Sequence, residues 1–186
     1  MNPLLHQAAT SAFHNPDAHI RDSVLHALKS LEQVPQHLEH WQAPLLQNQT
    51  LALCLQINPE QITQTRQLAA KLCDDGNFLL ALPLAMYCAS YAPDHAEHGF
   101  LAGACLQRLG QPAWAVHFYR VALQLNEADA ASAYRLGECL EAVGQLEEAR
   151  HLYNWAIELA RGNFALRALQ DMASERLAQL VTALRP

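Results

Sequence analysis

Residues 103–123 read GACLQRLGQPAWAVHFYRVAL, and residues 137–157 read GECLEAVGQLEEARHLYNWAI, 34 positions later. The windows 96–129 and 130–163 share eleven residues without a gap. The matched pairs are Ala96/Ala130, Gly103/Gly137, Cys105/Cys139, Leu106/Leu140, Gly110/Gly144, Gln111/Gln145, Ala115/Ala149, His117/His151, Tyr119/Tyr153, Ala122/Ala156 and Leu125/Leu159. A weaker copy lies another 34 residues upstream, where Leu72, Gly76 and Ala81 keep their places. The chain is therefore built from repeats.

A 34-residue period with this pattern is the signature of the tetratricopeptide repeat, a pair of antiparallel helices. Gly110 and Gly144 fall where the first helix ends and a left-handed residue is favoured. Gly103 and Gly137 fall inside a helix, where glycine is unfavourable unless another group approaches closely. One helix pair cannot bury its own apolar face, whereas stacked copies can. The sequence predicts an all-α superhelix of three repeats.

The pattern divides the chain into three parts: an N-terminal helical arm over 1–58, three repeats over 59–161, and a C-terminal capping helix over 162–186. Helices are expected at about 60–74, 77–91, 95–108, 112–125, 129–142, 145–160 and 163–184. Pro83 lies inside the second of these and should kink that helix or delay its start.

The arm does not follow the 34-residue frame. An apolar stripe at Ile20, Val24, Leu28 and Leu31 indicates a helix. Residues 41–57 form a second apolar stretch, and within it Leu51, Leu53, Leu55 and Ile57 alternate in a way that suits a strand. We expect helix there because a lone strand would have no partner. The first fifteen residues are expected to be disordered.

Composition excludes several classes of protein. The net charge is −6, and the few Lys and Arg residues form no patch, which argues against nucleic acid or an anionic membrane as partner. No run of about 18 apolar residues and no secretory signal is present. The five cysteines have no paired spacing, and four fall on apolar helix faces. Free thiols in a reducing cytoplasm are the simplest interpretation.

No pattern indicates catalysis, a cofactor or a metal. His95 and His98 are three residues apart, but Asp94 and Glu97 add only a loose cluster to them, so we interpret both histidines as solvated residues at a helix start. The sequence contains no phosphate loop, no GxSxG and no HExxH. We therefore expect a binding protein and not an enzyme.

In a stack of this kind the first helix of each pair lines the concave side. The positions expected to face inward are Thr63, Arg66, Ala70 and Cys73 in the first repeat, Glu97, Phe100, Ala104, Gln107 and Arg108 in the second, and Ala131, Tyr134, Glu138 and Glu141 in the third. Small residues leave room for an extended peptide, Phe100 and Tyr134 offer apolar pockets, and Gln107 and Glu138 can meet main-chain groups. The alternative is that these positions are merely solvated.

Two stretches, FLAGACLQRLGQ (100–111) and GECLEAVGQLEEA (137–149), resemble the second and third repeats of the class II chaperones of bacterial type III secretion, the SycD/LcrH family. The resemblance covers about residues 59–184. It implies a cytoplasmic bacterial chaperone that keeps hydrophobic, pore-forming translocator proteins soluble before export. It also implies an extended client segment in the concave groove, a mechanism without nucleotide, and homodimers through the N-terminal helices.

The chain departs from that family in two places. The family usually has aromatic residues in the first-repeat groove, where this chain has Arg66, Ala70 and Cys73, and the N-terminal arm is longer. A generic repeat scaffold or adaptor in a protein complex is the alternative function. A scaffold that clamps a peptide carboxylate would place cations in several repeats, and here only Arg66 and Arg108 qualify.

Overall fold

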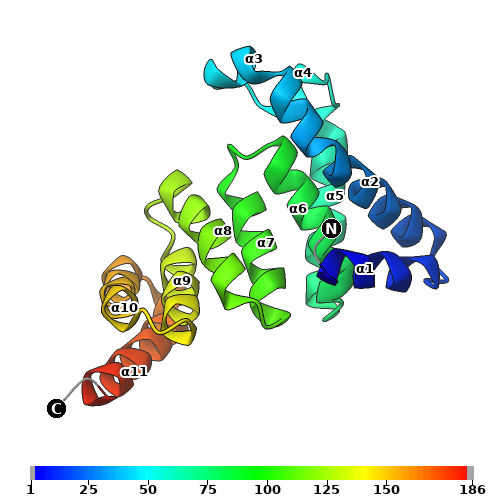
Figure 1. Ribbon diagram of the computed structural model, residues 1–186. Helices are drawn as coiled ribbons and strands as arrows, with labels where there is room; N and C mark the ends of the chain where they lie inside the picture. Colours follow the sequence, from blue (N-terminus) through cyan, green and yellow to red (C-terminus); the bar gives the residue numbers. More distant parts are fainter. Residues whose placement is uncertain (1–2, 184–186) are drawn as a thin grey trace.

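The computed structural model describes residues 3–183, and these form helices and no strand. The helices are α1 (Pro3–Phe13), α2 (Ala18–His40), α3 (Gln42–Leu46), α4 (Leu51–Cys54), α5 (Pro59–Asp74), α6 (Phe78–Tyr91), α7 (Ala96–Arg108), α8 (Pro112–Leu125), α9 (Ala130–Ala142), α10 (Leu146–Ala160), the 3₁₀ turn η1 (Phe164–Leu166) and α11 (Arg167–Ala183). Figure 1 shows them stacked along the molecule from the N-terminal arm to the C-terminal helix.

Three helix pairs, α5/α6, α7/α8 and α9/α10, form the predicted tetratricopeptide repeats, and each helix packs on the next in the chain. The expected bounds agree with the observed ones to within one or two residues. The prediction of an all-α tetratricopeptide-repeat superhelix is therefore confirmed.

Glycine ends the first helix of every repeat, as the sequence predicts. Gly76, Gly110 and Gly144 have φ values of 76°, 72° and 83°, in the left-handed region that L side chains rarely adopt. The residue after each glycine turns back to bond the helix, as where the Asn77 amide donates to the Leu72 carbonyl at 2.7 Å. These turns set the sharp reversal between the two helices of a pair.

The glycines inside α7 and α9 have a specific packing reason. A Cβ atom on Gly103 would lie 3.0 Å from the Tyr119 ring, and one on Gly137 would lie 2.9 Å from the Tyr153 ring. Both rings are almost fully buried. The tyrosine of the second helix thus lies directly on the first helix, and the glycine gives it that space.

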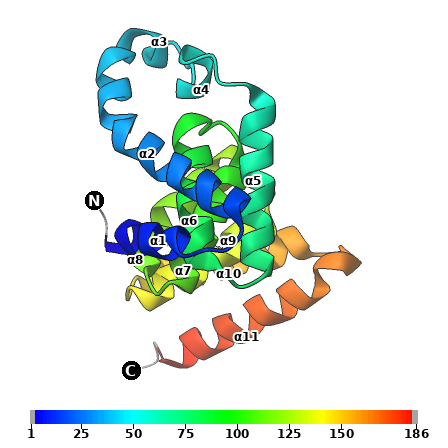
Figure 2. The same ribbon diagram turned by 90° about the vertical axis from the view of Figure 1, so that its right-hand side faces the viewer.

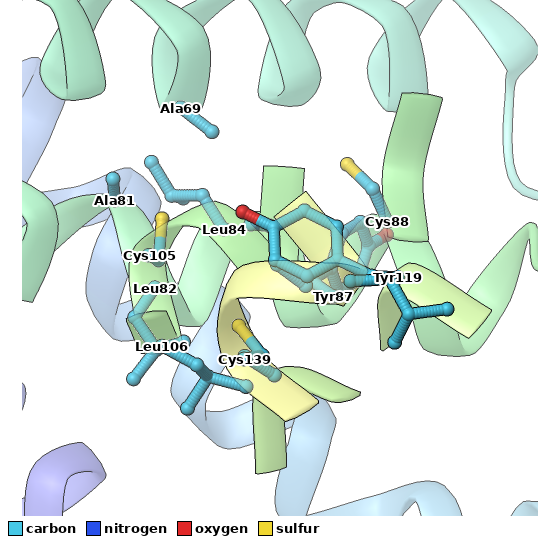
Figure 3. Close-up of a cluster of buried hydrophobic side chains, with 14 of the residues drawn as sticks. Ala69, Ala81, Leu82, Leu84, Tyr87, Cys88, Cys105, Leu106, Tyr119 and Cys139 are labelled. Carbon is cyan, nitrogen blue, oxygen red and sulfur yellow. The ribbon is translucent and has the colours of Figure 1, made fainter. Parts of the chain in front are cut away.

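Helix α6 has apolar residues on all its faces, and neighbouring helices pack around it. Nine of its fourteen residues are buried, and it packs against α5, α7, α1 and α2. The Tyr91 hydroxyl donates to the Ser30 carbonyl of α2 at 2.8 Å. Figure 3 shows α6 side chains such as Leu82, Leu84 and Tyr87 within the core. The helix runs through Pro83 from its expected start, so Pro83 does not delay it.

The arm differs from the sequence-based expectation at two points. The first fifteen residues are not disordered throughout, because Pro3–Phe13 forms α1 and buries Leu5, Ala8 and Ala12; residues 1–2 lie outside the described part. Residues 41–57 form neither a strand nor one helix but the short helices α3 and α4. Figure 2 shows these two bridging the ends of α2 and α5.

The C-terminal helix covers the last repeat. It packs chiefly on α10 and buries Ala173 and Leu180. The prediction of a capping helix over 163–184 corresponds to η1 and α11, and residue 184 lies outside the described part. Within residues 3–183, none of the helices is both long and apolar enough to cross a membrane.

Candidate peptide-binding groove

The first helices of the three repeats enclose a cleft of about 410 Å³, which we call the central cleft. Its lining includes five of the predicted groove residues: Arg66 and Ala70 from α5, Glu97 and Phe100 from α7, and Ala131 from α9. The remaining lining residues are Ala96, Leu101, Asn126 and Asp129. The structure therefore brings residues 65 positions apart in the sequence into one hollow. Their role as peptide contacts stays a prediction.

A second cleft of about 600 Å³ lies next to the first, and we call it the arm cleft. Arg66 and Glu97 line both clefts, and their side chains form an ion pair at 3.3 Å at the junction. Thr63 also lines the arm cleft, opposite Leu53 and Ile57 of the N-terminal arm. The sequence did not reveal these arm residues as candidates, because the arm does not follow the repeat frame.

The two aromatic groove candidates have different environments. Phe100 is partly exposed at the central cleft, with its ring edge-on to Tyr119 at 5.4 Å between centroids. Tyr134 is only 5% exposed and packs against Tyr153 at 5.8 Å. Phe100 can therefore meet a ligand with its apolar face, whereas Tyr134 is mainly a core residue. We expected Tyr134 to offer an apolar pocket to a ligand, but its side chain is buried and presents little surface.

The polar candidates of α7 and α9 bond to each other. Gln107 donates from Nε2 to Glu138 Oε2 at 3.1 Å and accepts from the Tyr119 hydroxyl at 2.9 Å. Arg135 also donates to Glu138, at 2.7 Å. The network satisfies the hydroxyl of Tyr119, whose pKa is raised chiefly by burial. Gln107 and Glu138 were expected to meet main-chain groups of a ligand, and about half of their bonding capacity is already used within the protein.

A second network closes the far end of the groove. The Tyr153 hydroxyl donates to Glu141 Oε2 at 2.7 Å, and Arg176 of α11 forms an ion pair with the same carboxylate at 3.4 Å. Burial, followed by the Glu141 carboxylate, raises the pKa of Tyr153. Glu141 thus joins the third repeat to the capping helix and is a structural residue.

In the first repeat, Cys73 occupies the position that Gln107 has in the second repeat and Glu141 in the third. Cys73 of α5 and Cys105 of α7 approach to 3.4 Å between their Sγ atoms. The neighbouring Arg108 guanidinium lies over the Phe78 ring at 4.9 Å from its centroid. The cation of Arg108 is therefore engaged with an aromatic face. All five cysteines are free; Cys88, Cys105 and Cys139 are buried, whereas Cys54 and Cys73 are partly exposed.

Other candidates lie outside the two clefts or need correction. Ala104 is half-buried and packs against the core, in neither cleft. The interpretation of His98 as a solvated residue is wrong: it is 4% exposed, and its Nδ1 lies 2.7 Å from the Ala92 carbonyl oxygen. Burial lowers the pKa of His98. Among residues 3–183, no cluster of three or more His, Cys, Asp or Glu could hold a metal ion.

A third cleft, of about 740 Å³, lies between α2 and α5 and is separate from the groove. Its lining combines polar side chains such as His26, Gln61 and Lys71 with apolar surface from Leu68 and Tyr87. It contains none of the predicted groove residues.

Comparisons with known proteins define the fold. The family model described as "Anaphase-promoting complex, cyclosome, subunit 3" matches residues 74–156. A comparison with curated proteins found no match. Several solved structures are similar to this chain, and they establish its class as a tetratricopeptide-repeat superhelix.

One is a T3SS complex from Aeromonas hydrophila, with 23% identity and a TM-score of 0.71, covering 78% of this chain and 97% of the other. Another is the Yersinia enterocolitica type III secretion chaperone SycD in complex with a peptide of the translocator YopD. It has 22% identity and a TM-score of 0.66, and covers 69% of this chain and 98% of the other. A third is the first TPR of Spaghetti bound to an HSP90 peptide, with 21% identity and a TM-score of 0.61, covering 69% of this chain and 96% of the other. At these identities the likeness concerns the fold.

Proposed function

We propose that this protein is a cytoplasmic chaperone of bacterial type III secretion. It binds hydrophobic translocator proteins before export and holds an extended segment of the client in the groove. The observation that carries the proposal is the central cleft, which crosses the first helices of all three repeats. The repeat motifs that resemble the SycD/LcrH family support it, as does the similar fold of SycD in complex with a YopD peptide.

The chemistry of the central cleft suits an extended apolar segment. Ala70 and Ala131 are small and leave room for a main chain, while Phe100 and Leu101 supply apolar walls. Asn126 and Asp129 add polar groups at one end. An extended peptide that places alternate side chains into such a hollow buries apolar area without folding. Covering that segment would keep a client from aggregating, and no nucleotide is needed.

The experiment is affinity purification of the tagged chain from its own cells, with mass spectrometry of what co-purifies. The expected result is a stoichiometric partner that carries long apolar segments. Overlapping synthetic peptides of that partner are then titrated against the purified chain by calorimetry. Ala70→Glu and Phe100→Ala should each weaken binding of the best peptide at least about tenfold, the equivalent of about 1.4 kcal/mol.

The matched control is His117→Glu, because His117 is exposed on α8 and lines neither cleft. It adds the same charge as Ala70→Glu and should leave peptide affinity unchanged. Loss of affinity in the control, or full affinity in both groove variants, would refute the groove as the binding site.

The alternative is a generic repeat scaffold or adaptor that binds folded partners or a peptide carboxylate. The fold is also similar to a repeat domain that is bound to an HSP90 peptide. However, Arg66 is paired with Glu97 and Arg108 lies over Phe78, so neither groove cation is free for a carboxylate. Folded, soluble partners whose binding is insensitive to Ala70→Glu would favour the scaffold.

We extend the proposal to a homodimer through the N-terminal helices. Leu38 of α2 and Leu46 of α3 are 47% and 86% exposed, although both are large and apolar. Light scattering on the purified chain should give the mass of a dimer, and Leu46→Glu should shift it toward the monomer. A monomer at all concentrations would rule out this part of the proposal and leave the groove unaffected.

A further inference from the structure

Two thiols on the first helices of adjacent repeats lie in contact, outside both clefts. Cys73 is on the last turn of α5, one turn beyond Ala70, and Cys105 is on α7. Their Sγ atoms are 3.4 Å apart. A disulfide has an S–S length of about 2.05 Å, so the two sulfurs need to approach by only about 1.4 Å.

The two cysteines differ in access and in acidity. Cys73 is partly exposed, whereas Cys105 is fully buried. The hydrogen bond between the two thiols lowers the pKa of Cys73, and the same contact together with burial raises the pKa of Cys105. Cys73 is therefore the more accessible and the more acidic of the two thiols. This is the arrangement of an attacking and a resolving cysteine.

We propose that Cys73 and Cys105 form a redox-active dithiol that hydroperoxides convert into a disulfide between the first and second repeats. The Cys73 thiolate attacks the peroxide O–O bond, takes one oxygen as a sulfenic acid and releases an alcohol, or water from hydrogen peroxide. The Cys105 sulfur then attacks the sulfenic sulfur, the S–S bond forms and water leaves. Two thiols and one hydroperoxide thus give one disulfide, one alcohol and one water.

The repeat itself supplies an internal control. Cys139 occupies in the third repeat the position that Cys105 has in the second, and it is equally buried. The position equivalent to Cys73 is Gln107, which bonds to Glu138 and not to a thiol. Cys139 therefore lies at the equivalent position of its repeat and is as buried as Cys105, but its neighbour from the preceding repeat is Gln107 and not a cysteine. The two sites separate the effect of a thiol pair from that of a buried cysteine.

The test uses the full purified chain and hydrogen peroxide. The number of thiols that react after denaturation should fall from five to three, and peptide mapping without reductant should find the Cys73–Cys105 link. Cys73→Ser should abolish the link, whereas Cys139→Ala should leave it intact. In Cys105→Ala, a sulfenic-acid trapping reagent should label Cys73, because the resolving thiol is absent.

Three results would overturn the proposal. They are five thiols after treatment, a disulfide between two Cys73 residues of separate chains, and sulfinic or sulfonic Cys73 beside a free Cys105. Circular dichroism of each variant establishes that it is folded, and Cys73→Ser, at a partly exposed position, is the variant expected to fold normally. None of these readouts requires a client, so the outcome is independent of the proposed chaperone function.

Discussion

The second and third repeats carry a glycine on the first helix and a tyrosine on the second, whereas the first repeat carries alanine at both positions. Gly103 faces Tyr119, and the residues 34 positions upstream are Ala69 and Ala85, both fully buried. A tyrosine ring opposite a glycine fills more space than two alanine methyl groups. The first helix pair therefore has a smaller side-chain contact at this crossing than the other two pairs.

The exchange also changes the groove. Each tyrosine carries a hydroxyl that bonds a groove residue, Gln107 in the second repeat and Glu141 in the third. Ala85 has no hydroxyl, and the equivalent groove position holds Cys73 in contact with Cys105. The first repeat therefore places a thiol where the second and third repeats have polar networks bonded to a tyrosine hydroxyl.

The largest expected effect comes from removing the tyrosine. Tyr119→Ala should lower the free energy of unfolding by about 3–5 kcal/mol, because it leaves a cavity in the core. Gly103→Ala should cost about 1–3 kcal/mol by forcing a Cβ against the ring. The double variant recreates the alanine pair of the first repeat and should be less destabilised than the sum. Urea unfolding of the four proteins measures this, and additivity within about 0.5 kcal/mol would contradict a direct contact between position 103 and the Tyr119 ring.

The next effect is alkaline destabilisation. Burial raises the pKa of Tyr87 to about 12 and raises that of Tyr119 and Tyr153 further. A raised pKa means that the fold favours the neutral phenol. The contribution to stability is complete below the unfolded pKa of about 10 and is lost as the pH rises above it. Tyrosinate absorbance should appear together with unfolding, and a titration near pH 10 with the helices intact would contradict this.

A smaller effect distinguishes the two hydroxyl bonds. Tyr153→Phe removes a bond to a carboxylate and should cost about 1.5–3 kcal/mol, whereas Tyr119→Phe removes a bond to an amide and should cost about 0.5–1.5 kcal/mol. Thermal and urea unfolding of both variants measure the difference. Equal costs would mean that the charge of Glu141 contributes nothing beyond a neutral acceptor.

The smallest effect concerns the ion pair between the two clefts. Arg66→Gln should change stability by less than about 1 kcal/mol, because its partner Glu97 is largely exposed. Arg135→Gln is the matched comparison, because Glu138 is only 18% exposed and Arg135 lies 2.7 Å from it. We expect the second substitution to cost more, and the reverse order would mean that the groove junction is a structural contact.

The repeated part of the chain was predictable because its rules are local. The turn glycines require positive φ, and the spacing of Gly103, Ala115 and Tyr119 reports how two helices cross. The groove was predictable only in outline. Position within the repeat indicates which residues face inward, but not that Gln107 bonds Glu138 or that Cys73 reaches Cys105 from the next repeat.

The arm was not predictable in the same way. The apolar stripe at Ile20, Val24 and Leu28 indicates α2. However, α1 and α2 pack on α6, which lies far along the chain, and no local period reveals that contact. The short helices α3 and α4 are separated and ended by Asn48 and Gln56 with positive φ, which no glycine marks in the sequence. The arm cleft was missed for the same reason.

The capping helix has a consequence for how such a chain can grow. Ala173 lies 34 residues after Cys139, which itself lies 34 residues after Cys105, and all three are fully buried. The cap is thus a fourth unit of which only the first helix is built, and Arg176 reaches Glu141 from it. The array is modular. A complete 34-residue unit inserted after residue 163 would pack on the third repeat at one end and on the capping helix at the other, and both contacts already exist between units of this chain. Its length could change by duplication without the invention of a new interface.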